Sequence, residues 1–245
     1  MAARTVVLLR HGRTPWNVAK RLQGQSDVAL DEVGRWQAVE AAAALVRRVR
    51  ADAVVTSDLS RAADTARAYA GLLGLDVVPD ERLRERAFGR WEGLTGPEIE
   101  ARWPEEYGVW RRGGEADGVP PEGEGRRATA ERVAGAIAEH AERLDDDATL
   151  LVVSHGASIN LALTVMLGLD PVGWRGMVGL DNAHWSELKR MRSDLVPAWR
   201  VAAHNVGAGY APDEWQAGPG PEASLDAPES DAAAPGDLEQ GARSA

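Results

Sequence analysis

Two of the five histidines in the sequence stand in the same local pattern. An apolar run at residues 6–9 leads through one arginine into His11, a second run at 150–153 leads through one serine into His155, and a glycine follows each histidine. Unbroken runs of β-branched and aliphatic residues predict buried parallel strands. Ligands of open α/β sheets bind beyond the carboxyl ends of such strands, so the pattern predicts two imidazoles at one binding edge.

Two arginines are expected at the same edge. Arg10 directly precedes His11, at the end of the first predicted strand. A further strand predicted at 53–57 runs into a helix whose first turn holds Arg61, where free backbone N–H groups and the helix dipole favour a bound anion. An isolated helix arginine is usually solvated, but one beside two histidine-bearing strand ends is a candidate phosphate ligand.

An acidic residue, Glu85, lies between Leu83 and Phe88 in a stretch that mixes charges, large apolar residues and glycines without a regular period. We predict an ordered loop there, in which a partly desolvated Glu85 carboxyl group is suited to general-acid work. Two alternatives stay open. Glu85 could instead form an ion pair with Arg84 or Arg86, and Glu92 is a rival for the acidic role.

Guanidinium, amide and imidazole groups at one edge would form a preorganised clamp for the three non-bridging oxygens of a phosphoryl group. A neutral His11 could attack phosphorus in line and form a phosphohistidine, while Glu85 protonates the leaving alkoxide and then deprotonates water or an acceptor hydroxyl. Arginines would supply the positive charge that a metal supplies elsewhere, so we expect no metal and no cofactor. The candidate set is Arg10, His11, Asn17, Arg61, Glu85 and His155.

The strands and helices predicted around this set alternate along the chain. That order predicts an α/β fold with three layers, α/β/α, in which the central sheet is mostly parallel and has an antiparallel edge. A helix capped by Asp31 and helices over about 127–144 and 157–167 would supply the outer layers. Segments 182–188 and 198–201 predict antiparallel strands that close the sheet on one edge.

Substrate selection is expected to depend on a lid of about residues 95–125. Within it the sequence predicts a helix broken at Pro104, followed by a loop rich in glycine, proline and acidic residues. Trp16, Gln23 and Trp110 are the expected rim residues of the substrate pocket.

The composition changes near residue 208. Residues 1–207 predict one catalytic domain, whereas 208–245 are rich in glycine, proline, alanine and acidic residues, and predict a disordered acidic tail. That tail contains eight acidic residues against one arginine, so it carries most of the formal net charge of −10. The near-neutral domain offers no extended basic face for nucleic acid.

The chain of 245 residues contains no cysteine, which excludes disulfides, thiolate metal sites and thiol nucleophiles. Its N-terminal apolar run is too short for a signal peptide or a membrane span. We therefore expect a soluble cytoplasmic protein that acts on a small molecule, with neither a nucleic-acid nor a membrane partner.

Five stretches together resemble the histidine phosphatase superfamily, in its phosphoglycerate-mutase-like branch. They keep the order and spacing of that family from about residue 4 to 205. The stretches are Arg10-His11-Gly12-x-Thr14-x-Trp16-Asn17, Ser57-Asp58-Leu59-x-Arg61, Leu83-Arg84-Glu85, Phe88-Gly89-x-Trp91-Glu92-Gly93 and Val153-Ser154-His155-Gly156.

The resemblance implies a catalytic set and a substrate pocket. His11 would be the phosphorylated nucleophile and Glu85 the proton donor, with His155 beside them. The substrate-binding residues would be Arg10, Asn17, Gln23, Gly24, Arg61 and Gly156. Dimers are common in this family, so a homodimer is one candidate assembly, although no exposed apolar stripe in the sequence identifies an interface.

Within the family, the stretches from Arg21 to Asp27 and from Asn182 to Trp185 are most similar to actinobacterial glucosyl-3-phosphoglycerate phosphatases. Phosphoglycerate mutases carry a longer insertion after the glutamate motif, so hydrolysis of a small phosphorylated metabolite is favoured over mutase activity. A non-catalytic phosphate-binding protein ranks third. Two departures bear on the substrate: Arg13 replaces a usual Gln or Glu, and Gly125 replaces a serine expected at the pocket rim.

Overall fold

The computed structural model describes residues 2–112, 120–191 and 195–220. Within these ranges the strands form one six-stranded sheet in the order β3-β2-β4-β1-β5-β6. Four neighbouring strands are parallel and the last two are antiparallel, as the sequence predicts. The strands are β1 (Thr5–Arg10), β2 (Ala53–Thr56), β3 (Val77–Pro79), β4 (Thr149–Ser154), β5 (Trp185–Arg190) and β6 (Trp199–Val206).

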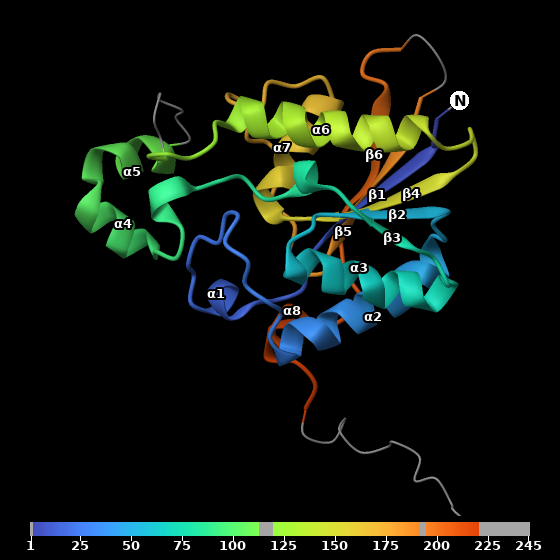
Figure 1. Cartoon of the computed structure of the whole chain (residues 1–245), viewed down its shortest axis with the longest axis horizontal. Coiled ribbons are helices and arrows are strands. Elements are labelled where there is room, and N and C mark those ends of the chain that lie inside the picture. The colour runs from blue at the N-terminus through green and yellow to red at the C-terminus, as the bar shows by residue number, and fades with distance from the viewer. Residues whose placement is uncertain (1, 113–119, 192–194, 221–245) are drawn as a thin grey trace, which may run out of the picture.

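Helices cover both faces of the sheet (Figure 1). The helices α2 (Glu32–Arg48) and α3 (Ser60–Leu73) lie on one face, and α6 (Arg126–Glu142) and α7 (Gly156–Met166) lie on the other. Strand β1 contributes to both cores because its side chains alternate, with Val6 and Leu8 in one cluster and Val7 and Leu9 in the other. The predicted three-layer α/β/α fold is confirmed.

The two strands that carry the histidines are direct neighbours in the sheet. β1 pairs with β4 in parallel, and their last residues, Arg10 and Ser154, stand opposite each other. His11 and His155 therefore leave the sheet at the same point of the same edge. This register is the structural reason that two histidines 144 positions apart in the sequence can share one site.

A cap of short elements lies beside that edge (Figure 1). It contains α1 (Pro15–Val18), α4 (Gly96–Arg102), α5 (Pro104–Arg111) and the 3-10 turn η2 (Gly89–Trp91). The preceding 3-10 turn, η1 (Glu81–Leu83), packs against α6 instead. The helix break predicted at Pro104 is confirmed, since Pro104 begins α5. Trp91 and Ile99 are fully buried in the cap. Residues 113–119 of the predicted lid lie outside the described residues.

The prediction of disorder is wrong for residues 212–217 at the start of the predicted tail. Residues 212–217 form a further helix, α8 (Pro212–Ala217), beside α2 (Figure 1). Trp215 is only 2% exposed and packs on Ala41 and Ala183. One large aromatic side chain with a docking site is enough to order a segment whose average composition predicts disorder. Residues 221–245 of the predicted tail lie outside the described residues.

Candidate active site

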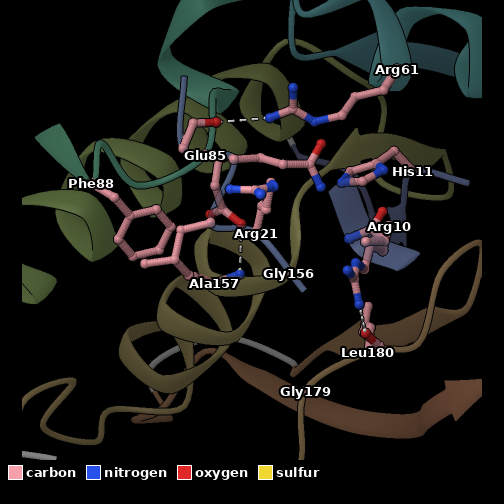
Figure 2. Close-up of a pocket in the computed structure, with 14 residues that line it drawn as sticks. Arg10, His11, Arg21, Arg61, Glu85, Phe88, Gly156, Ala157, Gly179 and Leu180 are labelled. Atoms are coloured by element: carbon pink, nitrogen blue, oxygen red, sulfur yellow. Dashed lines mark hydrogen bonds between the residues drawn. The ribbon is translucent and has the colours of Figure 1, made fainter. Parts of the chain in front are cut away.

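A cavity of about 220 Å³ opens at the carboxyl ends of β1 and β4 (Figure 2). Eight of the nine residues predicted for the site line it, and the ninth, His155, packs against His11 with ring centroids 5.2 Å apart. The lining residues are Arg10, His11, Asn17, Arg21, Leu22, Gln23, Gly24, Arg61, Glu85, Phe88, Gly156, Ala157, Gly179 and Leu180.

His11 is held in one defined protonation state. Its Nδ1 lies 2.6 Å from the carbonyl oxygen of Gly12. Because a carbonyl oxygen only accepts, Nδ1 must carry the proton, and Nε2 keeps its lone pair. Burial, followed by the charges of Arg61 and Arg10, holds the pKa of His11 well below 6.5. The ring is therefore a neutral imidazole with Nε2 available as a nucleophile.

His155 is held in the opposite tautomer. The Nε of Arg61 donates to its Nδ1 at 3.2 Å, so the ring proton must be on Nε2. Burial and the charge of Arg61 also hold the pKa of His155 well below 6.5, which keeps this ring neutral. His155 consequently presents an Nε2–H donor where His11 presents a lone pair.

Arg61 is fully buried at the start of α3, which agrees with its predicted place in the first helical turn. Besides His155, its guanidinium donates to the carbonyl oxygens of Ser26 and Gly24, each at 2.8 Å. Burial lowers the pKa of Arg61, and the nearby Glu85 opposes that effect. The Arg61 guanidinium thus connects the loop after α1 to His155 at the end of β4.

Two buried donors at this edge have no hydrogen-bond partner among the described residues: Nε of Arg10 and Nε2 of His155. Arg10 is anchored by Nη1, which donates to the carbonyl of Leu180 at 2.6 Å. A side chain at Gly156 would place its Cβ 3.4 Å from Nε of Arg10, so glycine leaves that nitrogen accessible. Buried donors that lack partners are costly, and an anion with several acceptor oxygens would satisfy both.

The loop around Gly24 is shaped by Glu92. Gly24 has φ +53°, and a Cβ there would lie 2.0 Å from a Glu92 oxygen, so glycine is required. The Glu92 carboxylate accepts from the backbone N–H groups of Gln25, Ser26 and Phe88. All of these contacts are structural, and Glu92 does not line the cavity. It is not the acid that the sequence offered as a rival to Glu85.

Glu85 lies at the N-terminus of α7 and is 9% exposed. Its Oε1 accepts from the N–H groups of Arg86 and Ser158 and from the Ser158 hydroxyl, at 2.8 to 3.0 Å. Among the described residues, its Oε2 accepts only from the N–H of Ala157, at 3.0 Å (Figure 2). Oε2 is therefore the oxygen with room for a proton. The predicted alternative of a pair with Arg84 is wrong, because Arg84 binds Asp58.

Two side-chain amides complete the cavity wall. The Asn17 Oδ1 accepts from the N–H of Thr14, and the Gln23 Oε1 accepts from the Thr14 hydroxyl, both at 3.0 Å. With their oxygens engaged, both side chains have NH₂ groups left to donate. An acceptor-rich ligand would match these donors as it matches Arg10 and His155.

The sequence analysis did not identify Arg21 as a residue of the cavity wall. It also placed Trp16, Trp110 and Gly125 at the pocket rim, and none of the three is among the described lining residues. Arg21 adds a third guanidinium, anchored to the Gly93 carbonyl and to Glu98, although it adjoins the predicted Gln23 in the chain. Of the expected rim tryptophans, Trp110 packs against Trp91, and neither it nor Trp16 is among the described lining residues. Gly125 is the N-cap of α6 and is likewise absent from the described cavity wall.

Within the described ranges, no group of three or more His, Asp or Glu residues could hold a metal ion. The helices in the same ranges include none that is both long and apolar enough to cross a bilayer.

A family model described as the histidine phosphatase superfamily, branch 1, matches residues 6–202. The chain belongs to the histidine phosphatase superfamily. The matched region runs from β1 into the first half of β6 and contains every predicted site residue.

Two named relatives and one solved structure show what this histidine phosphatase is similar to. The glucosyl-3-phosphoglycerate phosphatase of Mycobacterium tuberculosis is 38% identical over 224 residues, which cover 87% of this chain and 99% of the relative. The probable phosphoglycerate mutase GpmB of Yersinia enterocolitica is 41% identical over 200 residues, which cover 80% and 90%. A solved structure of a mycobacterial glucosyl-3-phosphoglycerate phosphatase with VO3 has a TM-score of 0.75 and 38% identity, covering 83% of this chain and all of that chain.

The superfamily and the phosphatase relatives make this protein a phosphomonoester hydrolase. The mutase relatives match a smaller part of this chain than the phosphatase relatives do. A mutase activity is therefore supported less well than hydrolysis.

Proposed function

We propose that this histidine phosphatase cleaves its substrate through a phosphohistidine on His11, without a metal ion, and that the substrate is a small metabolite with a second negative charge. The observation that carries the proposal is the pair of opposite tautomers. A neutral His11 with a free Nε2 lies beside buried donors of Arg10 and His155 for which the described part of the chain offers no acceptor. Nε2 of His11 can attack phosphorus, and the donors of Arg10 and His155 can bind the phosphoryl oxygens.

In the first step, Nε2 of His11 forms a bond to phosphorus while the bond from phosphorus to the ester oxygen breaks. The leaving oxygen takes the electron pair and receives a proton from Oε2 of Glu85. In the second step, the oxygen of a water molecule bonds to phosphorus, the bond from phosphorus to nitrogen breaks, and Glu85 takes a proton from the water. Arg10, Arg61 and the Nε2–H of His155 stabilise the phosphoryl oxygens throughout.

Arg21 supports a substrate with a second anionic group. Arg10 and Arg61 provide the cations for one phosphoryl group, and the cavity wall contains this third guanidinium in addition. Glucosyl-3-phosphoglycerate, named in the phosphatase relatives, carries both a phosphate ester and a carboxylate. We propose it as the first substrate to test. The cysteine-free composition supports a cytoplasmic location for the reaction.

The full-length protein is expected to hydrolyse 4-nitrophenyl phosphate at the same rate with and without excess chelator, since arginines hold the charge of the phosphoryl group. In a panel of phosphorylated metabolites, glucosyl-3-phosphoglycerate should have a higher kcat/KM than glucose phosphates, which lack the carboxylate. Phosphate release is the measurement. Loss of activity with chelator would contradict metal independence, and fast interconversion of 3- and 2-phosphoglycerate with slow phosphate release would establish the mutase instead.

The His11 ring should titrate at a lower pH than an exposed histidine. Burial and the charges of Arg61 and Arg10 hold its pKa well below 6.5, so the deprotonated nucleophile persists as the pH falls through 6.5. The measurement is an NMR titration of the ring carbon-bound proton, assigned by its absence from the spectrum of the His11→Ala variant. A midpoint at or above 6.5 would show that the ring is not neutral in the way that the proposed mechanism needs.

A further inference from the structure

Helix α8 is bound to the segments that surround His11, although it lies beyond the residues matched by the family. The indole Nε1 of Trp215 donates to the backbone carbonyl of Asn182 at 2.8 Å, in a buried position. The carbonyl of Trp215 accepts from the Gln37 amide, also at 2.8 Å. Arg13 donates to the carbonyl of Gln216, so the unusual arginine next to the histidine motif anchors α8 and does not line the cavity.

Asn182 connects α8 to the nucleophile. Its side-chain Nδ2 donates to the carbonyl oxygens of His11 and Gly12 at 3.1 and 3.3 Å, and it lies 3.3 Å from Oδ1 of Asn17. The Gly12 carbonyl is the same acceptor that holds the Nδ1 proton of His11. The position of this carbonyl decides which nitrogen of His11 faces the substrate, and Asn182 holds it in place.

We propose that Trp215 is a positioning residue for phosphoryl transfer, a role that rests on the function proposed above for His11. Its indole N–H fixes the Asn182 backbone, Asn182 fixes the Gly12 carbonyl, and that carbonyl keeps the proton of His11 on Nδ1. Trp215 itself does not line the cavity. Arg13 and Gln37, which both hold α8, also bind each other, since the Gln37 amide oxygen accepts from the N–H of Arg13 at 2.9 Å.

The indole nitrogen and the indole ring contribute separately. The ring packs against Trp36 and Tyr210, with centroids 5.0 and 5.5 Å away, and a phenyl group would keep most of that packing. The Asn182 carbonyl has one other close group, Nδ1 of His184 at 3.1 Å. Trp215→Phe therefore removes a single buried donor from Asn182 while α8 stays docked.

The test measures the His11 tautomer and the phosphorylation rate in the full-length protein. With ¹⁵N-labelled histidine, the wild-type His11 ring should show a protonated Nδ1 and a bare Nε2. In Trp215→Phe a fraction of the rings should carry the proton on Nε2. Rapid-quench measurement of phosphohistidine formation should give a rate about fivefold lower, as expected for the loss of one hydrogen bond. Inhibition by inorganic phosphate should change less than twofold, since Arg10 and Arg61 are untouched.

Trp36→Phe is the matched control, because it alters the same aromatic cluster without a bond to Asn182. It should leave both the nitrogen shifts of His11 and the phosphorylation rate at wild-type values. Gln37→Leu removes a second anchor of α8, the hydrogen bond to the Trp215 carbonyl, and should reproduce the Trp215→Phe result, so the proposal stays testable if the first variant does not fold.

Unchanged His11 shifts and an unchanged rate in folded Trp215→Phe would overturn the positioning role. So would equal losses in Trp215→Phe and Trp36→Phe. A wild-type protein that forms no phosphohistidine would overturn the proposed function instead, and the tautomer of His11 would still report on α8.

Discussion

Replacement of His11 by alanine is expected to lower kcat for every phosphate ester by about 10⁴-fold or more, because it removes the nitrogen to which the phosphoryl group is transferred. The neighbouring His155 cannot substitute for it. Its Nδ1 is occupied by Arg61, so its proton is on Nε2 and the lone pair needed for attack is absent. Steady-state hydrolysis of 4-nitrophenyl phosphate measures turnover, and detection of labelled protein after an alkaline quench, in which phosphohistidine is stable, measures the covalent intermediate.

A matched control is His140→Ala. His140 lies on α6, and its Nε2 lies at hydrogen-bond distance, 2.8 Å, from Oδ2 of Asp80, so its loss affects a contact on another part of the fold. This variant should keep wild-type kcat, even if its melting temperature falls. Labelled protein or more than residual turnover in His11→Ala would transfer the nucleophile role to another residue.

The meeting of His11 and His155 follows from the sequence for a simple physical reason. A buried parallel strand must be apolar on both faces, and both runs end in a polar residue at the same distance before histidine. Neighbouring strands with matched ends then bring the two rings together, as the pairing of Arg10 with Ser154 shows. Local signals of this kind, including the Asp31 cap of α2, are reliable because the deciding contacts lie within a few residues.

Contacts between segments that are distant in the sequence cannot be predicted from such local patterns. Glu85 and Glu92 are both acidic residues in one irregular loop, and only the fold shows that Glu92 holds the Gly24 loop while Glu85 faces the cavity. Trp215 is surrounded in sequence by residues typical of disorder, and its docking site is made by α2 and by the residues before β5. Such partners are set by tertiary packing, which composition and periodicity do not encode.

Glu85→Gln is expected to produce a loss that depends on the leaving group. For an alkyl ester such as glucosyl-3-phosphoglycerate, the leaving alkoxide is strongly basic and needs the proton, so kcat/KM should fall by about 10²- to 10⁴-fold. For 4-nitrophenyl phosphate, the leaving phenolate is a weak base, and its expulsion should be slowed far less. Glutamine keeps the size of the side chain and an oxygen for the donors that now meet Oε1, so the folded structure should be retained.

The two steps of the reaction can then be separated by the intermediate. In Glu85→Gln the phosphohistidine formed from 4-nitrophenyl phosphate should accumulate, because the water that attacks it no longer has a base within reach. Glu92→Gln is the matched control, and it should disturb the Gly24 loop and substrate binding without any dependence on the leaving group. Equal losses on both esters in Glu85→Gln, with no trapped intermediate, would mean that Glu85 only holds the N-terminus of α7 and that the proton comes from another group.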